Sequence, residues 1–205
     1  MGFYARRILP RLIAGGMRNP VMAAERPGLV GDASGDVLEL GLGSGLNIPY
    51  YARDRVRRLY GLEPSDALRR EATAPATAAA FPVELLAAGA ERVPLPDASI
   101  DTIVTTWTLC SIPDLPAALA EARRVLRPGG RLLFLEHGRA PDAGVARWQD
   151  RLAPFFRVAA GCSLNRPIDA DLTDAGFRFR WIERRYLRGP RFLSFHFRGE
   201  AEPAR

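Results

Sequence analysis

Short apolar runs recur along the chain at spacings that predict β-strands. The first five are five to eight residues long, are rich in Val, Ile and Leu, and end near glycine, proline or polar residues. Runs of this kind are typical of strands buried on both faces of a sheet. The predicted strands are Asp36–Leu40, Val56–Leu62, Pro82–Ala87, Ser99–Thr106, Arg131–Glu136, Phe177–Leu187 and Phe192–Ala201.

Between these runs, apolar residues repeat every three or four positions, which is the spacing of an amphipathic helix. Ser65 can cap the first of these helices, and Pro128-Gly129-Gly130 is expected to end the second. A helical N-terminal extension, residues 1–30, is expected to be broken at Pro10 and Pro20. The other predicted helices are Ser65–Ala80, Pro116–Leu126, Ala143–Ala160 and Pro167–Ala175.

Strands that alternate with helices favour βαβ units and a parallel sheet with helices on both faces. The last two strands are instead joined by Arg188-Gly189-Pro190, a hairpin signal that makes the C-terminal strand antiparallel. We therefore predict an α/β fold, a Rossmann-like three-layer αβα sandwich whose seven-stranded sheet is mostly parallel. The length of 205 residues suits a single domain over residues 1–205.

A glycine-rich loop follows the first predicted strand. In Val37–Asn47 (VLELGLGSGLN), Glu39 precedes Gly41, Gly43 and Gly45, which are spaced G-x-G-x-G. Glycine allows a tight turn and a close approach of ligand to backbone. Dinucleotide-binding loops have the spacing G-x-G-x-x-G and place a pyrophosphate at a helix N-terminus. An acid at the strand end suits a cationic ligand better, and a helix is expected after the loop.

Glu63 stands at the end of the second predicted strand, about 20 residues beyond the loop, in Gly61-Leu62-Glu63-Pro64-Ser65. An acid at this position accepts hydrogen bonds from ribose hydroxyls. Because NAD and other nucleoside ligands all contain a ribose, Glu63 indicates a nucleoside without distinguishing between them.

The loop and Glu63, taken with later motifs, resemble class I S-adenosylmethionine (SAM) dependent methyltransferases. The resemblance is to the broad group that includes the ubiquinone/menaquinone methyltransferases. It implies a Rossmann-like fold, SAM as the cofactor and S-adenosylhomocysteine as its product. The motifs follow in order as Glu39–Gly45, Glu63, Ala90–Pro94 with Asp97–Asp101, and Arg124–Gly130.

This resemblance places the cofactor at the loop and at the ends of the following strands. Members of the group often meet the adenine amine with an acid where this chain has Gly89. Backbone groups of Ala90 or the Glu91 side chain are therefore expected to serve instead. The predicted cofactor-binding residues are Glu39, Gly41, Leu42, Gly43, Gly45, Asn47, Glu63, Pro64, Ser65, Ala90, Glu91 and Thr106.

A narrower resemblance extends over nearly the whole chain, to small bacterial relatives of the animal thiol S-methyltransferases. It implies a small, apolar acceptor and makes a thiol the hypothesis. The relatives usually have His where this chain has Ser163, and the animal enzymes carry an N-terminal membrane anchor that is not predicted here. The motifs are Thr106–Ile112, Glu136-His137, Trp148-Gln149 and Gly161–Arg166.

His137 follows the fifth predicted strand, at the carboxyl edge where open α/β sheets bind ligands. A thiol acceptor must become a thiolate, and a neutral histidine can take a proton near pH 7. His137 is therefore the predicted catalytic residue. Glu136 and His196 are interpreted as structural and Cys110 as a small buried residue, while Trp107 belongs either to the core or to a pocket wall.

The distribution of charge limits the kinds of partner that we expect this protein to bind. All 29 basic residues are arginine, and their excess over the acids lies in residues 1–35 and 139–205. These arginines are scattered and no nucleic-acid-binding motif is visible, so no nucleic-acid partner is expected. Peripheral contact of the basic flanks with a membrane stays open.

Two cysteines and two histidines, all far apart in sequence, provide no disulfide framework and no zinc pattern. Neither histidine has a nearby Cys, His or carboxylate cluster in the sequence, so no metal site is expected. No apolar run has membrane-spanning length and no signal peptide is evident, so a cytoplasmic protein is expected.

The sequence leaves the methyl acceptor and the oligomeric state open. A lipid, quinone or phenolic hydroxyl is the alternative acceptor. An NAD-binding oxidoreductase is disfavoured by the loop spacing and by the motifs in residues 90–130. A non-catalytic SAM-binding module also stays open, because methyl transfer can proceed by positioning alone and needs no obligatory catalytic side chain.

Overall fold

A computed structural model describes residues 18–204 of the chain. A seven-stranded sheet runs through it in the order β3-β2-β1-β4-β5-β7-β6. Strands β1 to β5 pair in parallel, and β7 is antiparallel to both of its neighbours. The predicted fold class and the antiparallel C-terminal strand are thus confirmed. The strands are β1 (Gly35–Leu40), β2 (Val56–Leu62), β3 (Val83–Leu86), β4 (Ile100–Thr106), β5 (Leu126–His137), β6 (Phe177–Tyr186) and β7 (Phe195–Pro203).

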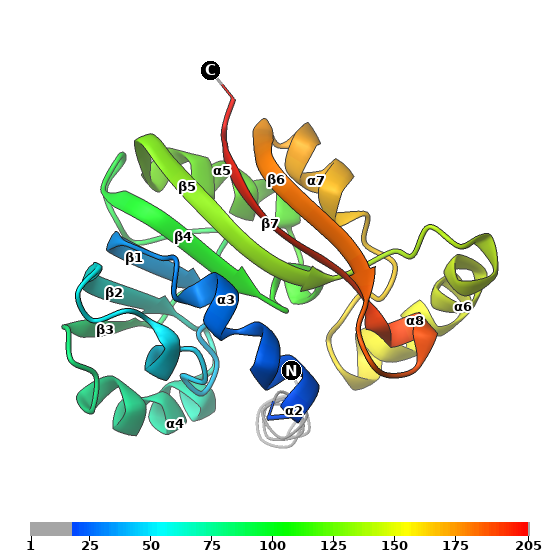
Figure 1. The fold of residues 1–205 in the computed structure, drawn as a ribbon, viewed down its shortest axis with the longest axis horizontal. Helices are drawn as coiled ribbons and strands as arrows, with labels where there is room; N and C mark the ends of the chain where they lie inside the picture. The colour runs from blue at the N-terminus through cyan, green and yellow to red at the C-terminus, as the bar shows by residue number, and fades with distance from the viewer. Residues whose placement is uncertain (1–17, 205) are drawn as a thin grey trace.

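Helices flank this sheet (Figure 1). Of the predicted N-terminal extension, residues 1–17 lie outside the described residues. Pro20 and Pro27 each begin a short helix rather than breaking one. Backbone N–H groups in the first turn of a helix have no acceptor within that helix, so the N–H that proline lacks is not needed there. The helices are α2 (Pro20–Glu25), α3 (Pro27–Val30), α4 (Asp66–Thr77), α5 (Leu115–Val125), α6 (Ala143–Ala159), α7 (Ile168–Asp174) and α8 (Arg191–Ser194), with the 3-10 turns η2 (Ile48–Tyr50) and η3 (Leu109–Ser111).

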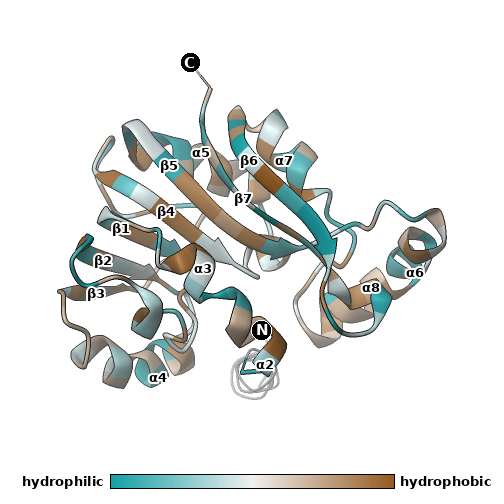
Figure 2. Cartoon of the chain, in the orientation of Figure 1, coloured by the Kyte–Doolittle hydropathy of each residue, from teal (hydrophilic) through white to brown (hydrophobic). Residues whose placement is uncertain are grey.

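Apolar side chains cover both faces of the central strands, and much of β4 and β5 has the hydrophobic colour in Figure 2. Consecutive residues of β5 alternate between the two faces: Leu132 and Phe134 join one buried cluster, and Leu133 and Leu135 join the other. This alternation follows from the two-residue period of a strand. The sheet is therefore buried on both sides, which fixes the position of its carboxyl edge.

The chain after the glycine-rich loop forms only the 3-10 turn η2, so the predicted helix at that point is wrong. Only eight residues, 48–55, separate the loop from β2, and Pro49 lies among them. So short a connection leaves room for a single tight turn before the chain enters the sheet again.

Two predicted strand starts are also wrong. Strand β5 begins at Leu126 because Leu126 already pairs with Ile100, and the Pro128-Gly129-Gly130 segment bulges out before the register resumes at Arg131. Strand β7 begins at Phe195 because residues 191–194 form α8, whose N-cap residue is Pro190. In both places proline and glycine reshape an element that the hydrophobic pattern alone cannot delimit.

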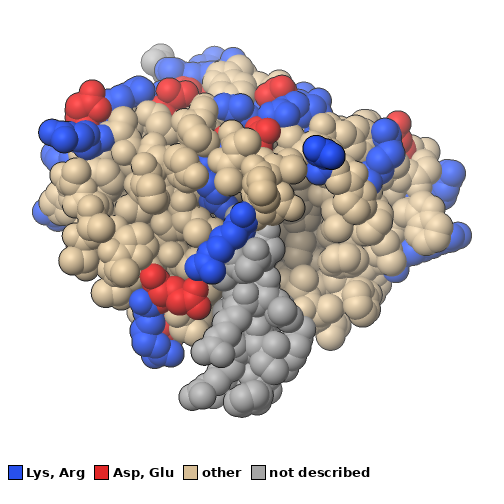
Figure 3. All heavy atoms as spheres, turned by 60° about the horizontal axis from the view of Figure 1, so that its bottom comes forward, with Lys and Arg blue, Asp and Glu red and all other residues tan. Residues whose placement is uncertain are grey.

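No helix within residues 18–204 combines the length and the apolar character needed to cross a membrane. Figure 3 looks onto the side of the molecule that lies at the bottom of Figure 1. On that face the charged side chains gather mainly toward the rim, and much of the remaining surface is uncharged.

Candidate active site

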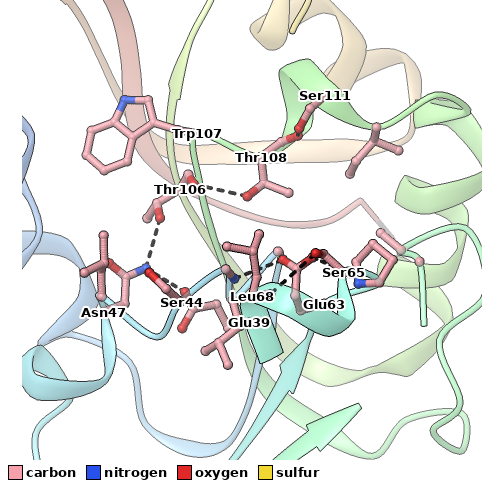
Figure 4. A pocket seen from close by; sticks show the side chains of 18 of the residues that line it. Glu39, Ser44, Asn47, Glu63, Ser65, Leu68, Thr106, Trp107, Thr108 and Ser111 are labelled. Atoms are coloured by element: carbon pink, nitrogen blue, oxygen red, sulfur yellow. Dashed lines mark hydrogen bonds between the residues drawn. The ribbon is translucent and has the colours of Figure 1, made fainter. Parts of the chain in front are cut away.

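A pocket of about 310 Å³ opens at the carboxyl ends of β1, β2 and β4 (Figure 4). This volume lies at the lower end of the range for small-molecule sites. The structure brings together eleven of the twelve predicted cofactor-binding residues in its lining. The exception is Gly45, where an added Cβ would meet Pro75 and Ile48, so this glycine serves packing against α4 and η2.

The loop after β1 is shaped by glycines in left-handed conformations. Gly41 has φ +70°, and a Cβ there would lie 2.4 Å from side-chain atoms of Thr108. Gly43 has φ +59°, and its backbone N–H donates to Glu63 over 3.0 Å. Only glycine adopts these angles without strain, and so the loop can lie close against the ends of β2 and β4.

Glu39 is buried beneath this loop and is held by two donors. Asn47 Nδ2 donates to one carboxylate oxygen over 2.7 Å, and Tyr51 Oη donates to the other over 2.8 Å. Asn47 Nδ2 also donates to Thr106 Oγ1 over 2.9 Å. Burial raises the pKa of Glu39 to about 7, against the opposing effect of these hydrogen bonds. Each oxygen can still accept from a ligand cation, which would complete the neutralisation of the carboxylate.

Glu63 joins the loop to the end of β2. Its two carboxylate oxygens accept from the backbone N–H groups of Gly43, over 3.0 Å, and of Ser65, over 2.8 Å. Burial raises the pKa of Glu63, although the backbone donors favour the ionised form. The carboxylate is therefore oriented in advance and keeps acceptor sites for a ribose diol.

Gly89 and Glu91 also line the pocket. A Cβ added to Gly89 would come within 2.6 Å of Glu91 Oε2. The carboxylate of Glu91 thus lies beside the position where the related enzymes often carry their acid. Contact of the adenine amine with backbone groups of Ala90 or with the Glu91 side chain stays a prediction.

Arg26 and Ser44 line the pocket although the sequence did not predict them, and Trp107, which the sequence left open between the core and a pocket wall, lines it as well. Arg26, in the N-terminal extension, is buried, donates to Asn47 Oδ1 and lies over the Trp107 ring, 5.0 Å from its centre. Trp107 adopts φ +51°, a strained backbone for a bulky residue. Ser44 Oγ and Trp107 Nε1 are buried at the pocket without a protein partner, so a polar ligand has two groups there to satisfy.

The carboxyl end of β5 forms a second polar region, outside the lining of this pocket. His137 Nε2 lies 2.8 Å from Cys162 Sγ, and Cys110 belongs to the same cluster, with the two Sγ atoms and a His137 ring nitrogen all within 4.8 Å of one another. Hydrogen bonding with Cys110 and His137 lowers the pKa of Cys162 to about 5. The hydrogen bond to Cys162 raises the pKa of His137, in spite of burial.

Glu136 and His196 lie at the same sheet edge, and both are predicted to be structural. Glu136 accepts from Thr105 Oγ1 and from the backbone N–H groups of Thr108 and Leu109, so it fixes the turn η3. Burial lowers the pKa of His196 to about 4, and its Nδ1 contacts the Ser194 carbonyl oxygen. These contacts agree with structural roles for both residues.

The premise that neither histidine lies near other ligand groups is wrong for His137. The residues that surround it, Cys110 and Cys162, are 27 and 25 positions away in sequence, and the fold brings all three together. No signal in the sequence spacing indicates this cluster, since each residue comes from a different segment at the same sheet edge.

Comparison with known proteins supports the assignment that the motifs suggest. Residues 38–134 match the family described as a methyltransferase domain. The human thiol S-methyltransferase TMT1B is 37% identical over 164 residues, which cover 77% of this chain and 66% of that protein. The mouse thiol S-methyltransferase TMT1B is 32% identical over 164 residues, covering 73% of this chain and 67% of that protein. The chain thus spans about two thirds of the length of these relatives.

Among solved structures, a SAM-dependent methyltransferase from Thermotoga maritima, described as a possible histamine N-methyltransferase, superposes with a TM-score of 0.68. It is 21% identical, and the match covers 95% of this chain and 99% of that one. At this level of identity the likeness concerns the fold alone, and it includes the arrangement of the sheet that forms the pocket.

Proposed function

This chain belongs to the SAM-dependent methyltransferases, and we propose that it methylates the sulfur atom of a small thiol. SAM is its cofactor. The observation that carries the thiol proposal is the likeness to the human thiol S-methyltransferase over 77% of the chain. That likeness is longer than the 38–134 segment matched by the family model, so it also takes in sequence outside the donor-binding motifs.

The pocket has a polar group suited to each part of SAM. Glu39 suits the methionine ammonium, Arg26 suits its carboxylate, and Glu63 suits the ribose hydroxyls, because each pairing joins opposite charges or a donor with an acceptor. Glu91 suits the adenine amine. The buried atoms Ser44 Oγ and Trp107 Nε1, which have no protein partner, are further groups that this ligand can satisfy.

In the proposed reaction the acceptor sulfur attacks the methyl carbon in line, and the bond between that carbon and the sulfonium sulfur breaks. Holding the two reacting atoms in this geometry supplies much of the rate. The acceptor must be a thiolate when it attacks, because the thiolate is the nucleophile. His137 stays the predicted catalytic residue.

A matched pair of acceptors tests the proposal most directly. Thiophenol and phenol share one ring and differ in sulfur against oxygen, and an aliphatic thiol and a quinol extend the comparison. With methyl-labelled SAM, label should enter the thiols and not the oxygen acceptors. Labelling of phenol or quinol alone would overturn the thiol proposal in favour of an oxygen acceptor.

The same assay tests His137. His137→Ala should lower thiol methylation by about a hundredfold, the lower limit for loss of general acid–base catalysis, while SAM still raises the melting temperature. The exposed Glu84→Ala variant on β3 serves as the matched control. A His137→Ala protein with full activity at every pH would remove His137 from the reaction.

A further inference from the structure

The cluster at the carboxyl end of β5 joins three ligand-bearing side chains from three segments. His137 ends β5, Cys110 lies in the turn η3, and Cys162 follows α6. Their ligand atoms lie within 4.8 Å of one another, with 2.8 Å between His137 Nε2 and Cys162 Sγ. Cysteine thiolates and histidine nitrogens are typical ligands of zinc in proteins, so this donor set suits zinc.

Backbone hydrogen bonds hold the three segments in place. The Ser163 N–H donates to the Cys110 carbonyl over 2.9 Å, which ties the loop of Cys162 to η3. The Arg139 N–H donates to the Arg166 carbonyl over 2.8 Å, which ties the same loop to the end of β5. The donor set is therefore positioned by the fold before any ligand arrives, as a specific metal site requires.

Metal binding needs both cysteines as thiolates. The hydrogen bond with Cys162 and burial raise the pKa of Cys110, which disfavours its thiolate while no metal ion is bound. The positive charge of Arg166 acts in the opposite direction and favours both thiolates. A divalent ion would take over this stabilisation, because a coordinating thiol is deprotonated outright.

The separations suit a small tetrahedral ion after a modest adjustment. Zinc lies about 2.3 Å from sulfur and about 2.0 Å from nitrogen in such sites, so its ligand atoms lie roughly 3.5–3.8 Å apart. The 2.8 Å contact between His137 Nε2 and Cys162 Sγ would open by about 0.7 Å. Three protein ligands leave one coordination position open, which is the arrangement of catalytic rather than structural zinc.

The cluster lies next to the methyl-donor pocket. Cys110 is flanked along η3 by Ser111, which lines the pocket, and its Sγ contacts the Trp107 carbonyl over 3.8 Å. Trp107 also lines the pocket and packs edge-on against His196, whose ring in turn packs against His137. The cluster thus adjoins residues of the pocket wall.

We propose that Cys110, His137 and Cys162 bind a zinc ion whose open coordination position takes the acceptor thiol. The nature of this fourth ligand rests on the proposed function, whereas the metal site itself does not. Two thiolates and a neutral imidazole balance the charge of the ion, and a bound acceptor thiolate adds one negative charge, which Arg166 offsets. His137 then acts as a ligand rather than as a free base.

The chemistry balances without a further reagent. The acceptor thiol gives its proton to the solvent buffer as its sulfur bonds to the ion. A sulfur electron pair then forms the bond to the methyl carbon, and the electrons of the breaking carbon–sulfonium bond stay on the sulfur of S-adenosylhomocysteine. The thioether product is neutral and a weaker ligand, so it leaves the ion.

Cobalt titration of the chelator-treated full chain tests the site without any need for activity. One equivalent of Co²⁺ should produce an intense thiolate-to-cobalt absorption, and one equivalent of Zn²⁺ should abolish it. Cys110→Ser, Cys162→Ser and His137→Gln should each weaken Co²⁺ binding at least tenfold. Ser163→Ala, beside the cluster, should bind Co²⁺ as the parent does. A SAM-induced rise in melting temperature shows which variants are folded.

Two outcomes overturn the metal site: no thiolate-to-cobalt absorption in the parent chain, or Co²⁺ binding with the affinity and absorption of the parent in folded Cys110→Ser and Cys162→Ser proteins. Addition of thiophenol to the cobalt form should strengthen the absorption through a third thiolate, and phenol should not. Cobalt bound at the cluster without methylation of any thiol would overturn the proposed function and leave the metal site standing. Thiol methylation that chelation and Cys110→Ser leave unchanged would overturn the role of the metal and leave the proposed function standing.

Discussion

The donor pocket and the cysteine–histidine cluster lie side by side at one sheet edge, yet they are assembled differently. Glu39, Asn47 and Glu63 lie within 25 consecutive residues and hold one another, directly or through the loop. Cys110, His137 and Cys162 come from segments 25 or more positions apart. The first region is a local motif that the sequence displays, whereas the second exists only after the sheet has formed. Variants that affect one region and spare the other test this division.

The largest effect is expected at Gly41. In Gly41→Ala the new methyl group would lie 2.4 Å from Thr108, and the residue would have to keep φ +70°. SAM affinity should fall at least a hundredfold by calorimetry, while Co²⁺ binding at the cluster should persist. Gly129→Ala is the matched control, because Gly129 has φ +83° with open space around it. It should lose only about 1–2 kcal/mol of stability, and equal SAM affinity in both variants would refute the packing argument.

Glu63→Ala should have the next largest effect. Hydrogen bonds to a charged group contribute about 1.5–3 kcal/mol, which corresponds to roughly a 10- to 150-fold loss of SAM affinity. The exposed Glu84→Ala on the neighbouring strand controls for loss of a negative charge. Unchanged SAM affinity in Glu63→Ala would remove this residue from the donor pocket.

Arg26→Met should weaken SAM binding by about tenfold, the loss of one charge-assisted hydrogen bond. Methionine keeps much of the arginine volume against Trp107. The binding of 5′-methylthioadenosine, which lacks the amino-acid part of SAM, should stay the same. A matched loss for both ligands would show that Arg26 shapes the pocket rather than pairing with the methionine carboxylate. Arg18→Met, at an exposed position, is the control.

The smallest expected effect is a pH-dependent change in stability that arises from Glu39. Burial raises the pKa of Glu39 from 4.5 to about 7, so between these values the folded chain holds a proton that the unfolded chain has lost. Stability should therefore fall as pH rises through this window and level off above it. Glu39→Gln should lack this part of the slope, measured as the difference in melting temperature between pH 5 and pH 8.

The difference in pH dependence between the parent chain and Glu39→Gln isolates the contribution of the Glu39 carboxyl group to stability. Burial also raises the pKa of Glu136 to about 7, but Glu136 is present in both proteins and its contribution cancels in the difference. Because the SAM ammonium favours ionised Glu39, the melting-temperature rise on SAM addition should grow with pH in the parent and stay flat in the variant. Identical pH profiles would mean that Glu39 does not titrate in this range.

The sheet could be predicted from the sequence because each strand carries its own apolar run. The observed β2, Val56–Leu62, has the predicted limits. The pattern could not place the start of β5, since Leu126 joins the strand across a glycine bulge. It also could not indicate Arg26, because a single arginine in an N-terminal helix looks the same whether it faces solvent or a pocket. Whether such a residue faces solvent or a pocket depends on contacts between segments that lie far apart in the sequence.

The position of β7 between β5 and β6 also matters while the protein is being made. Among the described strands, β6 has β7 as its only neighbour, and β7 follows it in the chain. During synthesis β6 therefore emerges with both edges unpaired, and it stays a target for aggregation or chaperone binding until β7 has been translated. Strands β1, β2 and β4, whose ends form the SAM pocket, pair with strands made before β6 and β7. We therefore expect a ribosome-bound chain to bind SAM before β6 and β7 have folded.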